Sequence, residues 1–286
     1  MLLIFGLGYT GAAMARDAAA AGSRVAITTR DPAARPLDGV EVIAFDAAAG
    51  LVAEATHIVS TVPPDASSQS DPVLAAYAGA MRASPALRWV GYLSTTGVYG
   101  DRAGGWVDEA TPPAPGQPRS RLRRATELAW EALGDRLAVD LFRVAGIYGP
   151  GRSALDDLRA GRARRVRKPG HMFGRIHRDD IAGAVLAAAG QSRPPGVRVL
   201  NLSDDEPAEA AAVTEYAAGL LGVAPPEPVP LDTARLSEMA RSFWSENRRV
   251  SSAATQAMLA RRWRYPTYRE GLIAILAEQA GQHPPE

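Results

Sequence analysis

The sequence predicts an α/β fold in which a doubly wound parallel sheet carries helices on both faces. Short apolar segments that are typical of buried strands alternate with longer segments of helical pattern over the first ~150 residues. The first strand is expected within 1–5, followed by a glycine-rich turn and an alanine-rich helix over 12–21. A second strand over 24–28 completes a βαβ unit, in which the crossover helix makes the two strands parallel.

The turn after the first strand is a G-x-G-x-x-G pattern over 6–11. Its first glycine allows the tight turn, the second lets a diphosphate approach the backbone, and the third lets the helix pack closely. The free N–H groups at the start of the helix and its positive dipole end favour phosphate binding. A glycine-rich turn of some other α/β protein is the alternative, but the strand–turn–helix context favours a dinucleotide site. The predicted cofactor-binding residues here are Gly6, Gly8, Tyr9, Thr10 and Gly11.

Composition limits the classes of partner that we expect. The 286 residues are 47% hydrophobic and 22% charged, which indicates a globular chain with ample core. A net charge of +1 gives no electrostatic reason to expect nucleic acid or a membrane as a partner, and no apolar run reaches membrane-spanning length. The chain has no cysteine, and its four histidines lack metal-ligand spacing, so we expect no thiol chemistry and no metal site. We also expect a cytoplasmic setting and no targeting segment before the first strand.

The residues after the second strand bear on the choice between NAD and NADP. An NAD-selective fold usually places an acid at the end of this strand for the ribose 2′-hydroxyl, whereas a 2′-phosphate needs a cation. Thr29 and Arg30 occupy this region, and the guanidinium of Arg30 suits a phosphate. We therefore expect NADP, with NAD as the alternative if Asp31 turns back toward the ribose. Arg30 could also be a solvated surface residue.

Two further strands are expected to bring residues to the same site. The third, over 40–45, is followed by Asp46, which could bind an adenine amino group or cap the next turn. The fourth, over 57–62, is broken by two prolines, which cannot continue a strand ladder. It ends at the carboxyl edge of the sheet, where a dinucleotide would lie. The predicted contacts there are Thr61, Val62 and Pro63.

The remaining elements follow the same alternation, with a change of composition after residue 152. We expect a dinucleotide-binding domain over 1–152, and a region over 153–286 that completes the sheet and forms a smaller C-terminal substrate lobe. The segment 159–168 holds six basic residues and no acid, which suggests a solvated face or a pocket for an anionic substrate. Helices are expected over 72–83 and 121–133, strands over 88–93, 137–144 and 197–202, a helix capped by Asp179 or Asp180, and an extended linker over 225–230.

Four motifs occur in order along the chain: GLGYTG at 6–11, STTGVYG at 94–100, FRVAGIYGPG at 142–151 and IHRDDIA at 176–182. Together they resemble the extended short-chain dehydrogenase/reductase superfamily, also called the NAD-dependent epimerase/dehydratase family. The resemblance covers nearly the whole chain, and it implies a Rossmann domain for NAD(P), a small C-terminal substrate lobe, and small-molecule substrates that are often nucleotide sugars. Members often pair through two long helices, so a homodimer is an expectation by analogy. The G-x-G-x-x-G form of the turn is similar to that of an atypical subgroup.

The chain departs from this family in its catalytic residues. Typical members use a Ser or Thr, a Tyr as acid/base, and a Lys four residues later that lowers the pKa of the Tyr and holds the nicotinamide ribose. The only lysine here is Lys168, and no Tyr-x-x-x-Lys exists. Thr95 falls at the Ser/Thr position, while Arg119 and Arg123 stand where the Tyr and Lys are expected. Arg123 could bind ribose or phosphate as a cation but cannot exchange protons at neutral pH.

Other residues could carry a proton or face the substrate. Tyr99 is expected at the pocket edge, four positions after Thr95, and is a candidate catalytic residue with Thr95 and Arg123. Tyr148, Arg152 and His177 are the predicted substrate residues, and the pKa range of His177 suits proton transfer. The alternative for each Tyr is a packed loop anchor, and for His177 a capping or core residue.

Two functions therefore compete. The first is an atypical NAD(P)-dependent oxidoreductase or epimerase in which Thr95 polarises an oxygen of a sugar-nucleotide or carbonyl substrate. The second is a regulatory or sensor protein that binds NADP(H) without turnover. The missing Tyr and Lys favour the second, while the retained Thr95 and the substrate lobe favour the first.

Overall fold

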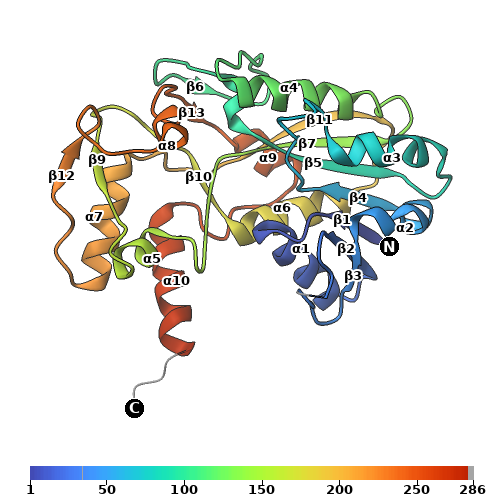
Figure 1. Ribbon diagram of the computed structural model, residues 1–286, viewed down its shortest axis with the longest axis horizontal. Helices are drawn as coiled ribbons and strands as arrows, with labels where there is room; N and C mark the ends of the chain where they lie inside the picture. Colours follow the sequence, from blue (N-terminus) through green and yellow to red (C-terminus); the bar gives the residue numbers. More distant parts are fainter. Residues whose placement is uncertain (34, 283–286) are drawn as a thin grey trace. The chain divides into compact units, whose positions relative to one another are not determined.

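The computed structural model describes residues 1–33 and 35–282 and divides the chain into two compact units (Figure 1). Unit 1 contains residues 1–98, 117–144 and 181–200. Unit 2 contains residues 99–116, 145–180 and the chain from 201 onward. Each unit is therefore assembled from three separate segments of the chain. The sequence analysis expects a single boundary after residue 152, and that boundary stays a prediction.

Unit 1 is built on a seven-stranded sheet in the order β11-β7-β5-β4-β1-β2-β3. The pairs β1–β2, β2–β3, β1–β4, β4–β5 and β5–β7 are parallel. Strand order runs outward in both directions from the β1–β4 boundary, so the predicted doubly wound α/β fold of Rossmann type is confirmed. The strands are β1 (Leu2–Phe5), β2 (Val25–Thr29), β3 (Glu41–Ala44), β4 (His57–Ser60), β5 (Trp89–Thr95), β7 (Ala138–Val144) and β11 (Gly196–Leu202).

Helices cover both faces of this sheet. Side chains from α2, α3 and α4 share one buried cluster with alternate residues of the strands, for example Tyr77, Trp130 and Tyr92. Figure 1 shows α3 and α4 on one side of the sheet and α1 and α6 on the other. The helices are α1 (Tyr9–Ala20), α2 (Ala49–Glu54), α3 (Pro72–Ala83), α4 (Pro118–Glu131) and α6 (Arg178–Ala189), and a 3-10 turn, η1 (Phe45–Ala47), follows β3.

Several element ends differ from the sequence expectations for local reasons. The fourth strand stops at Ser60 instead of residue 62, because Thr61 turns its hydroxyl onto carbonyl oxygens at the end of β1. Helix α4 begins at Pro118 instead of residue 121, since a proline is well suited to the first helical turn. Asp179 and Asp180 lie inside the first turn of α6 and do not precede it. Asp180 instead accepts hydrogen bonds from the N–H groups of residues 264 and 265.

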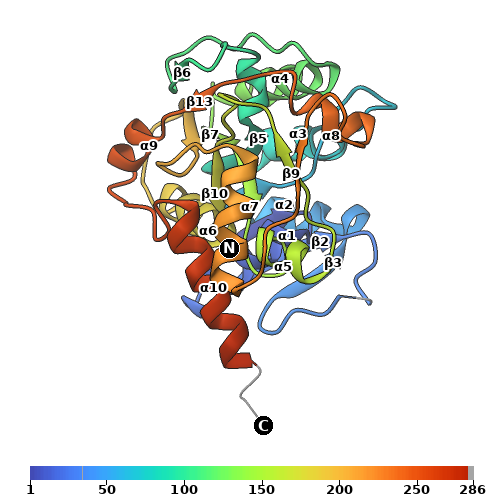
Figure 2. The ribbon, with the colours of Figure 1, turned by 90° about the vertical axis from the view of Figure 1, so that its left-hand side faces the viewer.

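Unit 2 consists of short parallel strand pairs and five helices among its described residues. Helices α5, α7 and α10 pack around a cluster that includes Leu155, Ala217 and Leu272, and Figure 2 shows α7 beside α10. The end of the expected linker 225–230 forms a strand, because residues 228–230 pair with β9. The pairs are β6 (Trp106–Val107) with β13 (Arg249–Val250), β8 (Gly146–Tyr148) with β10 (Arg175–His177), and β9 (Arg165–Arg167) with β12 (Pro228–Pro230). The helices are α5 (Ala154–Arg159), α7 (Ala210–Leu221), α8 (Glu238–Ser242), α9 (Ala253–Met258) and α10 (Tyr268–Gln282).

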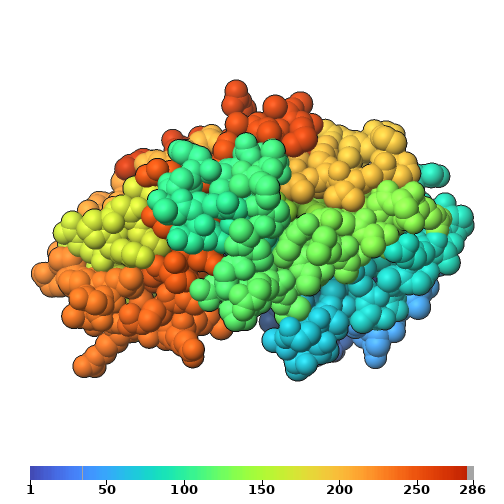
Figure 3. Space-filling view, turned by 90° about the horizontal axis from the view of Figure 1, so that it is seen from above, coloured from blue at the N-terminus to red at the C-terminus, as the bar shows by residue number. Residues whose placement is uncertain are grey.

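The outer side of α4 lies at the surface in the space-filling view (Figure 3), and Leu128 on this helix is 52% exposed. A leucine exposed to this extent is ordinary for one surface position and carries no conclusion alone.

Across residues 1–33 and 35–282, none of the helices is both long and apolar enough to cross a bilayer.

The approach of α1 to the end of β1 gives the first prediction. A Cβ added at Gly11 would lie 2.1 Å from the carbonyl oxygen of Gly6, whereas nothing lies within 4 Å of a Cβ added at Gly8. Gly11→Ala should therefore lower the free energy of unfolding by about 2 kcal/mol, because backbone must move to make room. Gly8→Ala, as the matched control, should change it by less than about 0.5 kcal/mol. Thermal unfolding of both variants checks this, and equal losses would contradict the account.

Candidate functional site

The glycine-rich turn is held in place by two threonines. Gly6 has φ +104°, a backbone conformation suited to glycine, and its N–H donates to Thr28 Oγ1 at 3.2 Å. The hydroxyl of Thr61 donates to the carbonyl oxygens of Phe5 and Gly6, at 3.1 and 3.0 Å. The side chain of Val62 lies 3.2 Å from the position of a Cβ on Gly6. The structure thus brings Gly6, Thr61 and Val62 together, with the Thr61 hydroxyl holding the turn itself, while their contact with a cofactor stays a prediction.

The space beside Gly8 fits an anion. Gly8 is the N-cap of α1, so no side chain caps the first N–H groups of this helix. A Cβ at Gly8 would meet nothing within 4 Å, so the backbone is open on that side. Open backbone beside an uncapped helix N-terminus offers donors and a positive dipole end to a phosphate. The residues present therefore fit a dinucleotide diphosphate, while the roles of Tyr9 and Thr10 stay predictions.

A cation that the sequence analysis missed reaches this turn. The guanidinium of Arg35 donates to the carbonyl oxygen of Leu7 at 3.2 Å, across 28 positions of sequence. Arg30 is exposed directly after β2, so both arginines come from the segment that follows this strand. Asp31 donates its N–H to Thr29 Oγ1 at 3.4 Å. The available signal in the sequence was a second arginine shortly after β2. Nothing in the neighbouring residues indicated that the Arg35 side chain reaches the glycine-rich turn.

Two other predicted cofactor residues lie at strand ends. Asp46 is exposed within η1, directly after β3, where either an adenine contact or a local structural role remains open. Pro63 is exposed after β4. Both positions stay predictions as cofactor contacts.

Thr95 ends β5, and Arg123 of α4 bonds to the same strand two residues before it. Thr95 is the last residue of this strand, and its Oγ1 accepts the N–H of Gly97 at 3.1 Å, which leaves its O–H free to donate. Arg123 donates through Nη1 to the carbonyl oxygen of Leu93 at 2.8 Å, and its guanidinium stands 5.7 Å from the ring centre of Tyr92. Arg123 therefore fixes the strand that carries Thr95. Its direct contact with a cofactor stays a prediction.

A buried ion-pair network anchors the same strand end to α4 and β7. Glu127 is fully buried and accepts from Ser94 Oγ at 2.7 Å. Arg143 donates to both of its oxygens, at 3.1 and 3.0 Å, and Arg124 donates at 2.9 Å. Two cations and a hydroxyl compensate the desolvated carboxylate, so the network fixes geometry next to Thr95.

Ser120 is a further hydroxyl that the sequence analysis missed. It is buried, and its Oγ lies 2.9 Å from the position of a Cβ on Gly97, while Thr95 Oγ1 lies 3.4 Å from the same position. Two hydroxyls therefore flank the α-carbon of Gly97. In the sequence, the available signal for Ser120 was its position directly after Arg119. A single serine is not distinctive, however, when the family's Tyr and Lys are missing around it.

In unit 2, Tyr99 is buried, whereas the sequence analysis expects it at a pocket edge; its role as a candidate catalytic residue stays a prediction. Its side chain is fully buried with Val107 and Val250, and its hydroxyl donates to Asn201 Oδ1 at 2.7 Å. Tyr99 is the last residue of the 3-10 turn η2 (Thr96–Tyr99). The packed-anchor interpretation fits this placement, because a phenol without solvent access cannot exchange protons with bulk water.

The structure brings Tyr148 and His177 together, with ring centres 5.2 Å apart. Tyr148 donates its hydroxyl to the carbonyl oxygen of Thr267 at 3.3 Å. His177 is 1% exposed and its Nδ1 accepts the N–H of Asp179 at 3.2 Å. Burial lowers the pKa of His177 well below its ordinary value, because the charged imidazolium is desolvated. Both placements favour packing roles, whereas Arg152 is exposed at the tight turn over 149–152. Substrate contact stays a prediction for all three.

The basic segment 159–168 is largely engaged by partners within unit 2. Its side chains neutralise nearby acids or bond to carbonyl and amide oxygens. These bonds favour a structural role for the basic residues over a pocket for an anionic substrate. The pairs are Arg159 with Gln279, Arg162 with Asp157, Arg164 with the carbonyl of Arg235, Arg165 with Glu215, and Lys168 with the carbonyl of Trp244. In the described parts of the chain, no group of three or more His, Cys, Asp or Glu could hold a metal ion.

One buried carboxyl of unit 2 has no hydrogen-bond partner among the described residues. Asp204 is 1% exposed, and neither of its oxygens is bonded. The nearby guanidinium of Arg175 donates to the carbonyl oxygens of Phe173 and Ala208. Burial raises the pKa of Asp204 to about 8, although the charge of Arg175 opposes this shift. The carboxyl is therefore largely protonated at neutral pH.

This raised pKa predicts how stability depends on pH. Asp204 titrates near 4 in an unfolded chain and about 8 in the folded one, so the folded state binds the extra proton between these values. Stability should therefore fall as pH rises through this window. Asp204→Asn stays neutral throughout, and its Tm should exceed that of the wild type by at least about 3 °C more at pH 8 than at pH 5.

The matched control for this measurement is Asp232→Asn, an exposed aspartate of the same unit. Its Tm should follow the wild type at every pH. Parallel Tm profiles for Asp204→Asn and the wild type would contradict the protonated carboxyl.

Comparisons with known proteins agree with this geometry. No protein-family model matches the sequence, and no curated protein matches it. Its structural neighbours are NAD-dependent epimerase/dehydratase-type proteins. One, from Methylobacillus flagellatus and assigned only provisionally to that class, is 28% identical over 97% of this chain and 98% of its own, with a TM-score of 0.73. Another, MoeE5 in complex with UDP-glucuronic acid and NAD, is 20% identical over 99% of both chains with a TM-score of 0.77, and at that identity it shows the fold alone.

A closer similarity defines the family more narrowly. The chain belongs to the same family as a functionally unknown conserved protein from Silicibacter pomeroyi DSS. The two are 43% identical, over 97% of this chain and 98% of the other, with a TM-score of 0.88.

Proposed function

We propose that the chain is an NAD(P)-binding protein of the epimerase/dehydratase type, with the diphosphate of the dinucleotide at the N-terminus of α1. The observation that carries this proposal is the open backbone at Gly8 beside an uncapped helix N-terminus, within a strand–turn–helix. The bound NAD in the MoeE5 structure supports the cofactor class. Tyr9, Thr10 and Val62 line the cofactor on this proposal, and Asp46 lies at its adenine end.

The proposed preference is for NADP. Arg30 follows β2, and the guanidinium of Arg35 lies against the carbonyl of Leu7 in the turn. Two guanidinium groups near the adenosine end would bind a 2′-phosphate through charge-assisted hydrogen bonds. NAD stays the alternative, with Asp31 on the ribose.

Fluorescence titration with NADPH and NADH tests both parts of this proposal. We expect NADPH to bind at least about tenfold more tightly than NADH, since one good charge-assisted contact accounts for that ratio. Arg30→Ala and Arg35→Ala should each weaken NADPH binding and leave NADH binding nearly unchanged. Gly8→Val should weaken both, because its side chain fills the space beside the helix N-terminus. Unchanged NADPH affinity in both arginine variants would refute the NADP preference but leave the dinucleotide site intact.

In the enzymatic form of the proposal, the cofactor supplies hydride transfer and the chain supplies orientation. Thr95 would donate its O–H to a carbonyl or hydroxyl oxygen of a sugar-nucleotide or other carbonyl substrate. Arg123 and Glu127 would hold the end of β5 so that this hydroxyl keeps its direction. Tyr148, Arg152 and His177 are the proposed substrate side. The UDP-glucuronic acid bound to MoeE5 supports the sugar-nucleotide class.

The second candidate function is a regulatory or sensor protein that binds NADP(H) without turnover. The absence of Tyr-x-x-x-Lys favours it, and the burial of Tyr99 and the lowered pKa of His177 also favour it, because both make proton exchange at these side chains less favourable.

Two readouts separate the two functions: the change in nicotinamide absorbance with a panel of carbonyl compounds, and formation of the epimer with a panel of sugar nucleotides, because an epimerase returns the hydride and leaves the absorbance unchanged. The enzymatic form predicts turnover that falls at least about a hundredfold in Thr95→Val, because a lost electrophilic hydrogen bond costs that order of rate. NADPH affinity should be unchanged in this variant. Tight NADPH binding with no turnover on any substrate would instead support the sensor.

Homodimer formation is part of the proposal by analogy with the epimerase/dehydratase family, in which two long helices pair. The exposed Leu128 on α4 would lie in such an interface. The proposed setting is cytoplasmic, with no nucleic acid or membrane partner.

A further inference from the structure

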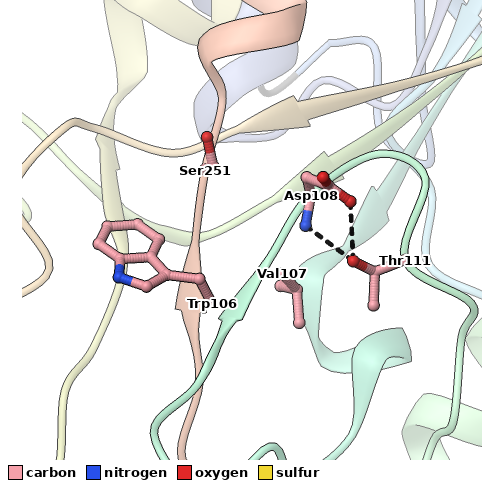
Figure 4. Close-up of a pocket in the computed structure, with 5 residues that line it drawn as sticks. All are labelled: Trp106, Val107, Asp108, Thr111 and Ser251. Carbon is pink, nitrogen blue, oxygen red and sulfur yellow. Dashed lines mark hydrogen bonds between the residues drawn. The ribbon is translucent and has the colours of Figure 1, made fainter.

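A hollow of about 420 Å³ opens on unit 2 where β6 and β13 pair (Figure 4). It lies in the size range of small-molecule sites. We call it the Trp106 hollow. Its lining residues are Trp106, Val107, Asp108, Thr111 and Ser251.

The strand pair itself places an indole in solvent. Side chains alternate along a strand, and Val107 is buried with Val250, its register partner on β13. Trp106 therefore faces outward and is 59% exposed. An indole exposed to this extent offers a broad apolar face to a ligand, and tryptophan is enriched where proteins bind other molecules.

The polar groups of the hollow are fixed before any ligand arrives. Thr111 Oγ1 donates to Asp108 Oδ1 at 2.8 Å and accepts the N–H of Asp108 at 3.0 Å (Figure 4). The N–H of Ala110 also donates to Asp108 Oδ1, at 3.1 Å. One oxygen of this carboxylate is thereby held in position while its side chain stays exposed. Ser251, the residue directly after β13, adds a hydroxyl to the lining.

Charge selects the class of ligand. No cation lines the hollow, and Asp108 would repel an anion. Arg249 is the register partner of Trp106, and its guanidinium donates to the carbonyl oxygen of Gly104 at 3.0 Å. This nearby positive charge offsets Asp108, so a cationic ligand gains little. A neutral ligand with an apolar face and several hydroxyls satisfies the indole, the carboxylate and the two hydroxyls together.

We propose that the Trp106 hollow binds the glycosyl ring of a neutral carbohydrate. The C–H bonds on one face of the sugar ring carry partial positive charge and stack on the negative face of the indole. The sugar hydroxyls donate to Asp108 and to the hydroxyl oxygen of Thr111, whose own proton is bonded to Asp108, and they exchange hydrogen bonds with Ser251. This site is additional to the proposed dinucleotide site and shares no residue with it.

Saturation-transfer difference NMR on the full chain tests the proposal, with methyl β-D-glucopyranoside and methyl β-D-galactopyranoside as probes and choline as a cationic probe. We expect saturation transfer to at least one glycoside, with affinity at least about tenfold lower in Trp106→Ala, the usual scale for loss of one aromatic stacking contact. Asp108→Ala should also weaken binding. Phe243→Ala, which removes another half-exposed aromatic ring of unit 2, should leave it unchanged.

Thermal unfolding and NADPH titration complete the test. Both should match the wild type in Trp106→Ala, because the side chain is exposed and outside the proposed cofactor site. No transfer to either glycoside, equal transfer in Trp106→Ala, or choline binding that depends on Trp106 would each overturn the proposal. A change of oligomeric state in Trp106→Ala without glycoside binding would overturn it in favour of a protein-binding surface.

Discussion

The close approach of α1 to the end of β1 is the constraint on which the proposed cofactor site depends. A Cβ on Gly11 would meet the carbonyl oxygen of Gly6 at 2.1 Å, so the two segments touch backbone to backbone. Gly6 takes φ +104°, and the hydroxyl of Thr61 holds its carbonyl oxygen from the neighbouring strand. Because these contacts leave no room for adjustment, they also fix where the N-terminus of α1 points. The open backbone at Gly8 follows from the same geometry.

The second organising feature is the way α4 holds the end of β5. Arg123 bonds to the carbonyl of Leu93, and Glu127, one helical turn later, bonds to Ser94. Two consecutive residues before Thr95 are thus held by one face of the helix. In the family that the sequence resembles, this face carries the acid/base Tyr and its Lys. Here Arg119 and Arg123 stand at those two positions, and Arg123 and Glu127 bond to the two residues that precede Thr95.

The fold could be predicted from the sequence because its signals are local. Alternating apolar strands and helical segments, the glycine spacing over 6–11 and the two prolines after β4 each reflect short-range chemistry. The ends of elements were less predictable. The fourth strand, for example, stops before Thr61, whose hydroxyl bonds to the carbonyl oxygens of Phe5 and Gly6, far away in the sequence. The proposed site follows the same division. The glycine-rich turn could be recognised in the sequence. The places of Arg35 beside this turn and of Ser120 beside Gly97 could not, because tertiary contacts between distant segments decide them. The burial of Tyr99 and His177 was likewise decided by tertiary packing.

The most direct test of the central claim is a crystal structure of the protein with NADPH. The account predicts electron density for the diphosphate against Gly8 and the first N–H groups of α1, with the 2′-phosphate within reach of Arg30 and Arg35. Full occupancy of the dinucleotide at another place, or an unrelated ligand seated on the turn, would contradict it.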